Sequence, residues 1–254
     1  MILLTGANGF IGKNIQLYFE KKNQKIIVTS RNKKQFKKQD CFHEIINVGN
    51  LNSATNWTYA LKGVHCVIHT AGIAEVQKKE EDVLNYLLVN TEGTKRLAEQ
   101  AAEAGVRRLI FLSTAKVYGE GTNKTYTLND LPDPQEWYSI SKLKAEKKLW
   151  KIFKKTGMEI VILRLPLVYG YGVKGNILRL MRLIEYKIPL PFGLLTNKKS
   201  LLGVDNLIDI IIVCIEHPNA AGKTFLVSDD DDITIKELIR HIAFAMKIPV
   251  ILFP

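Results

Sequence analysis

The chain contains 254 residues with a mass of 28.8 kDa, which allows one large core or a domain with a small appendage but excludes a string of independent domains. Hydrophobic residues make up 46% of the sequence and charged residues 24%, a globular composition that excludes a disordered chain or a fibre. The 36 basic and 25 acidic residues give a net charge of +11, which favours anionic partners such as phosphorylated small molecules, nucleic acid or acidic membrane surfaces.

The cysteine usage and the apolar runs indicate the compartment. Cys41, Cys66 and Cys214 are widely spaced and form no CxxC pair, which fits a reduced compartment and predicts no metal site. No signal peptide precedes the first strand, and the longest apolar stretch, residues 207–215, is interrupted by Asp209. The lysines are scattered over predicted helix faces without interleaved aromatic residues. We therefore predict a soluble cytoplasmic protein with no nucleic-acid partner and no membrane insertion.

Short apolar runs alternate with amphipathic stretches from the first residue onwards. The runs are bounded by glycine, asparagine or charge and are typical of buried parallel strands; they are residues 2–5, 25–29, 44–46, 66–69, 108–113 and 159–163. The amphipathic stretches predict helices at residues 9–22, 83–105 and 138–156. In the last of these, a charged face with Lys144, Glu146, Lys147 and Lys148 lies opposite an apolar one. This alternation predicts a doubly wound α/β fold with a parallel Rossmann sheet.

The alternation breaks after Leu163, where glycine and proline crowd into a loop-rich stretch. We expect residues 1–165 to form a dinucleotide-binding Rossmann domain, with residues 203–222 packing back onto it. Residues 166–202 and 223–254 are expected to form a smaller C-terminal substrate-binding lobe.

A glycine motif, Thr5-Gly6-Ala7-Asn8-Gly9-Phe10-Ile11-Gly12, links the first strand to the first helix. Gly6 permits the tight turn, Gly9 lets the backbone approach a pyrophosphate, and Gly12 allows close packing of the helix on the sheet. The free N–H groups and the partial positive charge of the helix N-terminus then face the phosphates. The motif predicts dinucleotide binding.

The end of the second strand carries no acidic residue for the ribose hydroxyls, in contrast to the usual NAD site. The chain has Ser30 and Arg31 there, followed by further basic residues up to Lys38. These residues could hold the 2′-phosphate that a carboxylate would repel. We therefore favour NADP(H) and leave NAD(H) open.

Tyr138 and Lys142 are four residues apart and thus lie on one helical face. An ammonium next to a tyrosine favours the phenolate and lowers its pKa, so the pair could pass a proton to or from a carbinol or carbonyl. Thr114, at the carboxyl end of a predicted strand, could hydrogen-bond the same substrate oxygen.

With these motifs, the sequence resembles the extended short-chain dehydrogenase/reductases, in particular the NAD-dependent epimerase/dehydratase family that acts on nucleotide sugars. His69-Thr70-Ala71-Gly72, Asn90-Thr91-Glu92-Gly93-Thr94 and the segment from Arg164 to Gly170 also match family segments. The resemblance implies that Thr114, Tyr138 and Lys142 are the catalytic residues. It implies a cofactor site, besides Arg31, of Gly6, Gly9, Phe10, Ile11, Gly12, Asn50, Leu51, Ala71, Asn90 and Pro166.

The same resemblance narrows the reaction. Family 4,6-dehydratases carry Asp-Glu directly after the catalytic Thr, whereas this chain has Ala115 and Lys116, so we expect no standard dehydratase. The second half resembles the branch that makes UDP-N-acetylhexosamine derivatives for surface polysaccharide, which implies that Asn176 and Lys199 bind substrate. Lys199 would contact the UDP phosphates, with charge but without the bidentate fork of arginine.

Two reactions at C4 of a UDP-hexose or UDP-N-acetylhexosamine remain open. We favour a 4-keto-sugar reductase of the UDP-N-acetylquinovosamine type; the alternative is a UDP-sugar 4-epimerase that retains its NAD. A non-catalytic NADP(H)-binding sensor is a further alternative. The resemblance also implies a possible homodimer through a four-helix interface, and a lobe that is incomplete at its C-terminus, since family members continue beyond Pro254.

Overall fold

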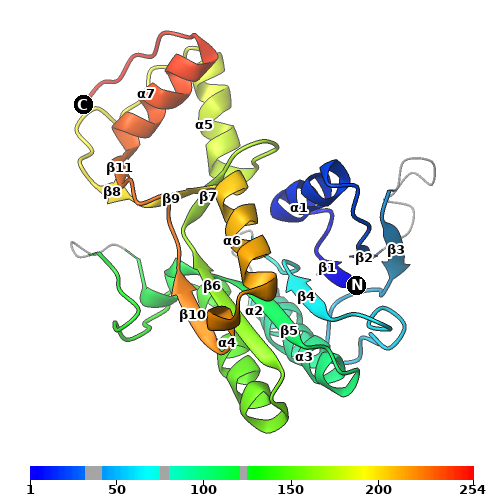
Figure 1. Ribbon diagram of the computed structural model, residues 1–254. Helices are drawn as coiled ribbons and strands as arrows, with labels where there is room; N and C mark the ends of the chain where they lie inside the picture. The colour runs from blue at the N-terminus through cyan, green and yellow to red at the C-terminus, as the bar shows by residue number, and fades with distance from the viewer. Residues whose placement is uncertain (32–41, 75–79, 121–124) are drawn as a thin grey trace. The chain divides into compact units, whose positions relative to one another are not determined.

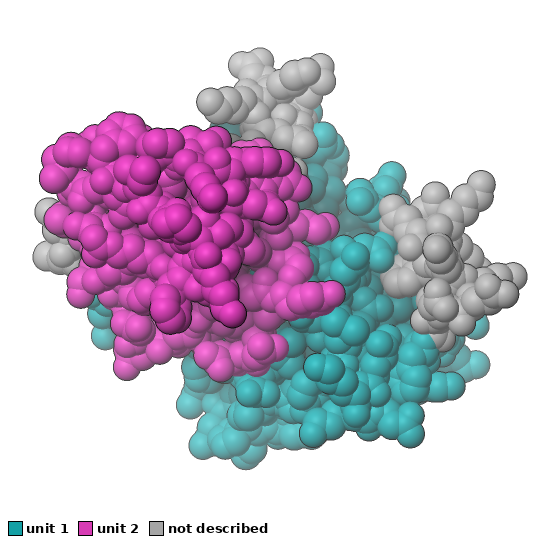
Figure 2. Space-filling model, turned by 90° about the horizontal axis from the view of Figure 1, so that it is seen from above, with its two compact units in different colours: residues 1–165, 208–226 teal, residues 166–207, 227–254 magenta. Residues whose placement is uncertain are grey.

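The computed structural model describes residues 1–31, 42–74, 80–120 and 125–254. The chain divides into two compact units. The first consists of Met1–Leu165 with Ile208–Leu226, and the second of Pro166–Leu207 with Val227–Pro254. Figure 2 shows the first unit in teal and the second in magenta.

The first unit is built on a seven-stranded, fully parallel sheet, which confirms the predicted Rossmann-type α/β fold. Its strand order is β3-β2-β1-β4-β5-β6-β10 (Figure 1). The strands are β1 (Ile2–Thr5), β2 (Ile27–Ser30), β3 (Glu44–Asn47), β4 (Cys66–His69), β5 (Arg108–Thr114), β6 (Glu159–Leu165) and β10 (Lys223–Leu226). All residues of β1, β2, β4 and β5 are buried, as the unbroken apolar runs predict.

Helices cover the sheet in the first unit. They are α1 (Phe10–Lys21), α2 (Glu80–Tyr86), the π-helix η2 (Leu87–Gly93), α3 (Thr94–Glu103), the 3₁₀ turn η3 (Ala115–Tyr118), α4 (Trp137–Thr156), the part of α6 (Val204–Glu216) from Ile208 on, and the 3₁₀ turn η4 (Pro218–Ala220). The predicted helix at 83–105 is therefore three consecutive segments with a π-helical turn in the middle. Gly157 ends α4 in the left-handed conformation, with φ of +75°.

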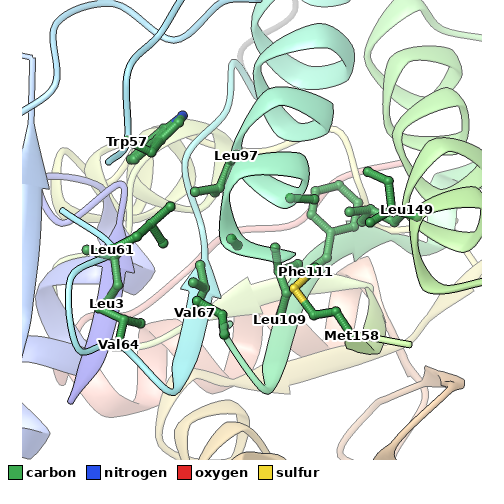
Figure 3. Packing of buried hydrophobic residues seen from close by; sticks show 14 of the residues in the cluster. Leu3, Trp57, Leu61, Val64, Val67, Leu97, Leu109, Phe111, Leu149 and Met158 are labelled. Carbon is green, nitrogen blue, oxygen red and sulfur yellow. The ribbon is translucent and has the colours of Figure 1, made fainter. Parts of the chain in front are cut away.

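The main hydrophobic core lies between the sheet and the pair α3 and α4. Figure 3 shows Leu109 and Phe111 of β5 packed among side chains from both helices, including Leu97 of α3 and Leu149 of α4. Trp57, which is fully buried, closes the core from the segment that precedes β4.

The strand at 223–226 differs from the expectation that it belongs to the smaller lobe. It pairs in parallel with β6, Phe225 opposite Leu163, and forms an edge of the main sheet. The residues of α6 from Ile208 on belong to the same unit, whereas residues 203–207 belong to the second one. β10, with its partly buried apolar side chains, pairs with β6 because β6 has an open edge in the sheet. The local composition of residues 223–226 does not indicate this pairing.

The second unit contains short strands and two helices. Its elements are β7 (Leu167–Tyr169), α5 (Gly175–Glu185), β8 (Lys198–Lys199), β9 (Leu201–Gly203), β11 (Ile233–Thr234) and α7 (Ile235–Met246). Strands β7 and β9 pair in parallel, and β8 pairs antiparallel with β11. Ile184 of α5 and Ile239 of α7 are buried in a small core of their own. Within the described ranges of both units, no helix is long and apolar enough to cross a membrane.

A buried arginine holds the return segment of the chain to the sheet. Arg108, only 1% exposed, donates from Nε to Glu159 Oε2 at 2.7 Å and from Nη1 to the carbonyl oxygens of Cys214 and His217, at 2.6 and 3.1 Å. We expect Arg108→Ala to lower the free energy of unfolding by about 3 kcal/mol, because it leaves buried acceptors without a donor. Urea denaturation measures this loss.

The matched control is Lys95→Ala, which removes an exposed i,i+4 pair with Glu99 of 3.5 Å. Such a pair contributes about 0.5 kcal/mol or less. A loss for Arg108→Ala no larger than that of the control would contradict the anchoring role.

Candidate active site

The loops after β1 and β4 meet at the point where the strand order reverses. The register pairs Thr5 with His69, so both loops leave the same edge of the sheet. Gly6 has φ of +73°, and a Cβ atom on it would lie 2.6 Å from both Ala71 N and Thr70 Oγ1. Only glycine fits this position, because Gly6 and Ala71 lie so close together. The two residues lie at the crevice where open α/β sheets bind ligands.

The start of α1 is shaped for an anion. A Cβ atom on Gly12 would overlap the carbonyl oxygen of Gly6, so the helix can pack this closely only with glycine. Gly9 N donates to Gly6 O at 2.9 Å, and no side chain caps the helix. The first turn, which begins with Phe10 and Ile11, carries no acidic residue. The free N–H groups and the positive end of the helix thus suit the pyrophosphate of a dinucleotide.

The end of β2 holds the residues that bear on the choice of cofactor. Ser30 is buried and Arg31 is exposed. The rest of the basic run up to Lys38 lies outside the described residues. A preference for NADP(H) over NAD(H) stays a prediction.

Asn90 lies at the centre of η2 and is completely buried. Its Oδ1 accepts from Ile73 N at 2.8 Å, and its Nδ2 donates to Ile73 O at 3.0 Å and to Ser141 Oγ at 2.9 Å. The side chain thus joins the segment after β4 to α4. These contacts hold the segment next to Ala71 in place, and the predicted role of Asn90 in the cofactor site stays a prediction.

Thr114 and Tyr138 come together from different elements. Thr114 is the last residue of β5, and Tyr138 is the second residue of α4. Their side chains are hydrogen-bonded to each other. Lys116 N also donates to Thr114 Oγ1, at 3.2 Å. Two hydroxyl groups therefore converge where one substrate oxygen could bind both.

Lys142 lies one helical turn after Tyr138 and is 5% exposed. Its Nζ donates to the carbonyl oxygen of Leu112 at 2.9 Å and lies 4.6 Å from the ring centroid of Phe111. Burial lowers the pKa of Lys142 to about 8, and the nearby Glu146 carboxylate limits the decrease. The ammonium form is thus retained close to neutral pH.

The pKa of Tyr138 differs from the expectation that Lys142 lowers it. Burial raises the pKa to about 12, whereas Lys116 and the hydrogen bond with Thr114 act in the opposite direction. In this structure the Lys142 ammonium donates to the Leu112 carbonyl, and Lys116 is the charge that lowers the pKa of the phenol most.

A buried ion pair lies beneath this pair of residues. Arg164 of β6 donates from Nη2 to Glu146 Oε2 at 2.6 Å and from Nε to Oε1 at 3.2 Å. Ser113 of β5 donates to Glu146 Oε1 as well, and Arg164 reaches Tyr118 OH at 2.6 Å. Glu146 is 1% exposed, so its predicted place on the solvated face of the helix is wrong. Because Tyr138, Lys142 and Glu146 are spaced by four, all three face the sheet.

His69 forms a further buried link. Its Nδ1 is 2.6 Å from Thr5 Oγ1 and its Nε2 is 2.8 Å from Thr94 Oγ1. Burial and the charge of Lys142 lower the pKa of His69 to about 3, so the ring is neutral and connects β1, β4 and α3 without adding charge.

The remaining predicted site residues lie elsewhere in the chain. Asn50 is exposed, and Leu51 is buried in the main core. Pro166 is the first residue of the second unit. Asn176, at the start of α5, and Lys199, on β8, are exposed residues of that unit. No group of three or more His, Cys, Asp or Glu side chains within the described ranges could hold a metal ion.

Several site residues were not identified from the sequence. Ser141, Glu146 and Arg164 join the predicted residues through hydrogen bonds, and Lys116 adds a charge near Tyr138. The available signal was the four-residue repeat from Tyr138 through Lys142 to Glu146, which places a third polar side chain on the buried face.

The fold and site together define a dinucleotide-binding α/β protein with a tyrosine and a lysine at the sheet edge. The sequence matches the NAD dependent epimerase/dehydratase family over residues 2–228. The chain belongs to this family.

Similar proteins agree with this assignment. A UDP-glucose 4-epimerase from Vibrio cholerae is 43% identical over 253 residues, 98% of this chain and 76% of the relative. An N-acetyl-alpha-D-glucosaminyl-diphospho-ditrans,octacis-undecaprenol 4-epimerase from Escherichia coli O157:H7 is 28% identical over 98% of this chain and 73% of its own length. The structure of a UDP-glucuronic acid 4-epimerase from Bacillus cereus, in complex with UDP-glucuronic acid and NAD, shares the fold with a TM-score of 0.85. It is 22% identical and covers 99% of this chain and 85% of its own.

The burial of Lys142 has a cost that depends on pH. Its pKa is about 8 in the folded chain and 10.5 otherwise, so the folded state binds the proton less tightly and is destabilised at pH values below 8. The cost disappears as the pH rises from 8 to 10.5. We expect Lys142→Met to raise the free energy of unfolding at neutral pH by about 1–3 kcal/mol, and by less at about pH 10.

Urea denaturation at both pH values measures this difference. Lys144→Met, which changes an exposed lysine of the same helix, serves as the control and is expected to have no such pH dependence. A Lys142→Met protein that is less stable than the parent at neutral pH would contradict the burial cost.

Proposed function

We propose that this protein is an NAD-dependent UDP-sugar 4-epimerase. The observation that carries the proposal is the pairing of the Tyr138 hydroxyl with Thr114, with Lys142 one turn away, in the same unit as the glycine cradle of Gly6 and Gly12. The 43% identity to a UDP-glucose 4-epimerase supports epimerisation over the reductase reading favoured by the sequence alone. The preferred sugar is expected to be a UDP-hexose or a UDP-N-acetylhexosamine.

The glycine cradle fits a dinucleotide, and the residues around it would hold one. Gly6, Gly9 and Gly12 would contact the pyrophosphate through backbone N–H groups. The segment around Ala71, held in place by Asn90, would border the cofactor on the β4 side. When bound, NAD supplies the acceptor for a hydride from C4 and a positive charge on its oxidised ring.

The side chains of this chain would move the proton. Tyr138 would take the proton of the 4-hydroxyl group during oxidation at C4, and would return it to the same oxygen during the reduction that inverts this centre. Thr114 holds the same oxygen through its hydroxyl. Lys142, cationic near neutral pH, favours the phenolate once its bond with the Leu112 carbonyl loosens. Asn176 and Lys199 of the second unit are proposed to bind the substrate, with Lys199 at the UDP phosphates.

A 4-keto-sugar reductase is the second candidate, because one observation favours it. The described end of β2 consists of Ser30 and Arg31 with no carboxylate, which suits the 2′-phosphate of NADP(H), a cofactor that leaves after each reaction. In this case the chain would reduce a 4-keto sugar once instead of inverting C4.

The two functions differ in the nucleotide they need. We expect the purified protein to carry NAD, and to interconvert UDP-glucose and UDP-galactose, or the N-acetyl pair, without added cofactor. Tyr138→Phe is expected to reduce the rate at least about 10³-fold with nucleotide affinity nearly unchanged, because the proton acceptor is lost. Chromatography of the released nucleotide and of the sugar products measures both.

Other results of these experiments would support a different function or mechanism. Stoichiometric NADPH consumption with a 4-keto sugar would establish the reductase instead. Binding of NADP(H) with no turnover of either sugar class would establish a non-catalytic sensor. A Tyr138→Phe protein with near-normal turnover would remove Tyr138 from the mechanism.

A homodimer through helices of the first unit is a further part of the proposal. Leu84 of α2 and Leu88 of η2 are 65% and 45% exposed, an arrangement that suits a helix interface. We expect sedimentation equilibrium to give twice the chain mass, and Leu84→Glu/Leu88→Glu to give monomers. Phe244→Glu, which changes an 87% exposed residue of α7, is the control that should not alter the mass. A monomeric parent protein would contradict the interface.

A further inference from the structure

We infer that Lys116 is a positioning residue for Tyr138: it fastens the start of α4 to the turn after Thr114 and places a positive charge beside the phenol. The inference rests on the proposed function for its meaning in catalysis. It concerns a residue that lies next to the site without forming part of the Thr114, Tyr138 and Lys142 set.

The side chain of Lys116 joins two elements. Its Nζ pairs with Glu120, just after η3, and lies 2.8 Å from Glu136 Oε2, at the start of α4. Glu136 is the N-cap residue of α4, its N donates to Ser139 Oγ at 3.3 Å, and the Ser139 hydroxyl donates to Glu136 O at 2.9 Å. Lys116 therefore ties down the helix end two residues before Tyr138.

The backbone of the same residue contacts the other half of the pair. Lys116 N donates to Thr114 Oγ1 at 3.2 Å, and Thr114 is hydrogen-bonded to Tyr138. One residue thus orients Thr114 through its amide and the start of α4 through its side chain. The carboxylates hold the charge firmly: burial lowers the pKa of Lys116, but its hydrogen bonds with Glu120 and Glu136 raise it by more.

The charges around the phenol give Lys116 a second effect. The groups that act on Tyr138 are Lys116 of η3, Thr114 of β5, Tyr86 of α2 and Glu136 ahead of α4. Burial raises the pKa of Tyr138 most; Lys116 is the largest of the opposing influences, followed by the Thr114 hydrogen bond, while Tyr86 and Glu136 raise the pKa further. Lys116 therefore favours the phenolate that a proton acceptor requires.

Opposite charge changes separate the electrostatic effect from a structural one. Lys116→Gln removes the cation, and Glu136→Gln removes the anion of the same ion pair. If Lys116 acts on the phenol by charge, the first variant lowers the ionised fraction of Tyr138 and the second raises it. If the ion pair only holds the helix, both variants move the ionised fraction in the same direction.

The ionised fraction can be followed directly. The parent protein and the variants are labelled with ¹³Cζ-tyrosine and compared by NMR at one alkaline pH, about 11. The Tyr138 signal is assigned through Tyr138→Phe, and circular dichroism checks that each variant is folded. We expect Lys116→Gln to lower the ratio of ionised to neutral Tyr138 by about 3–10-fold, and Lys116→Arg to restore it. Lys148→Gln, which removes a lysine of the same helix that pairs with Glu92 at 3.0 Å ten residues after Tyr138, is the control and should leave the ratio unchanged.

The kinetic counterpart uses the pH profile. In Lys116→Gln we expect kcat at neutral pH to fall by about 3–10-fold with KM within about twofold, and the rate to recover as the pH rises. A loss of kcat that persists at all pH values, together with an unchanged Tyr138 ratio, would overturn the inference. The NMR ratio needs no turnover, so absence of epimerase activity in the parent protein would refute the proposed function and leave the charge effect of Lys116 measurable.

Discussion

The buried carboxylate of Glu146 is the constraint on which the arrangement of the site depends. It is bound by Ser113 of β5 and Arg164 of β6, which are direct neighbours in the sheet register. A buried charge held by two strands fixes both the rotation and the axial position of α4, since any other placement leaves an ion without its partner. Two turns earlier on the same face, Tyr138 is thereby brought to Thr114 at the end of β5. The ion pair fixes the position of α4, and the arrangement of the candidate site follows from it.

Local motifs were predictable because their requirements are local. The turn at Gly6 needs a positive φ and space for Ala71, and the close approach at Gly12 needs the absence of a side chain; both requirements are visible in one short segment. The spacing of Tyr138 and Lys142 likewise follows from helical periodicity alone. For the same reason the six apolar runs of the sequence correspond to the first six strands, β1 to β6.

Features that depend on distant partners were not predictable. The strand at 223–226 joins the main sheet because β6 offers an open edge, which its own sequence does not encode. Glu146 has the residue type of a solvated helix face, and its burial depends on two partners distant in sequence, Ser113 and Arg164. The pKa of Tyr138 depends on how much water the fold removes and on where the Lys142 ammonium binds. A periodic pattern carries none of this information.

The π-helical turn at η2 has a consequence for how variation in this chain is interpreted. A π-helical turn contains one residue more than an α-helical turn. The side-chain faces of α2 and α3 are therefore rotated relative to each other, although the three helical segments follow one another without a gap. Insertions and deletions are therefore not equivalent here. Loss of one residue from Leu87–Gly93 would restore a regular helix and rotate the side chains on one side of the loss by about 100°. Asn90 would then turn away from Ile73 and Ser141, so a single-residue gap in this short stretch marks a protein whose site is built differently.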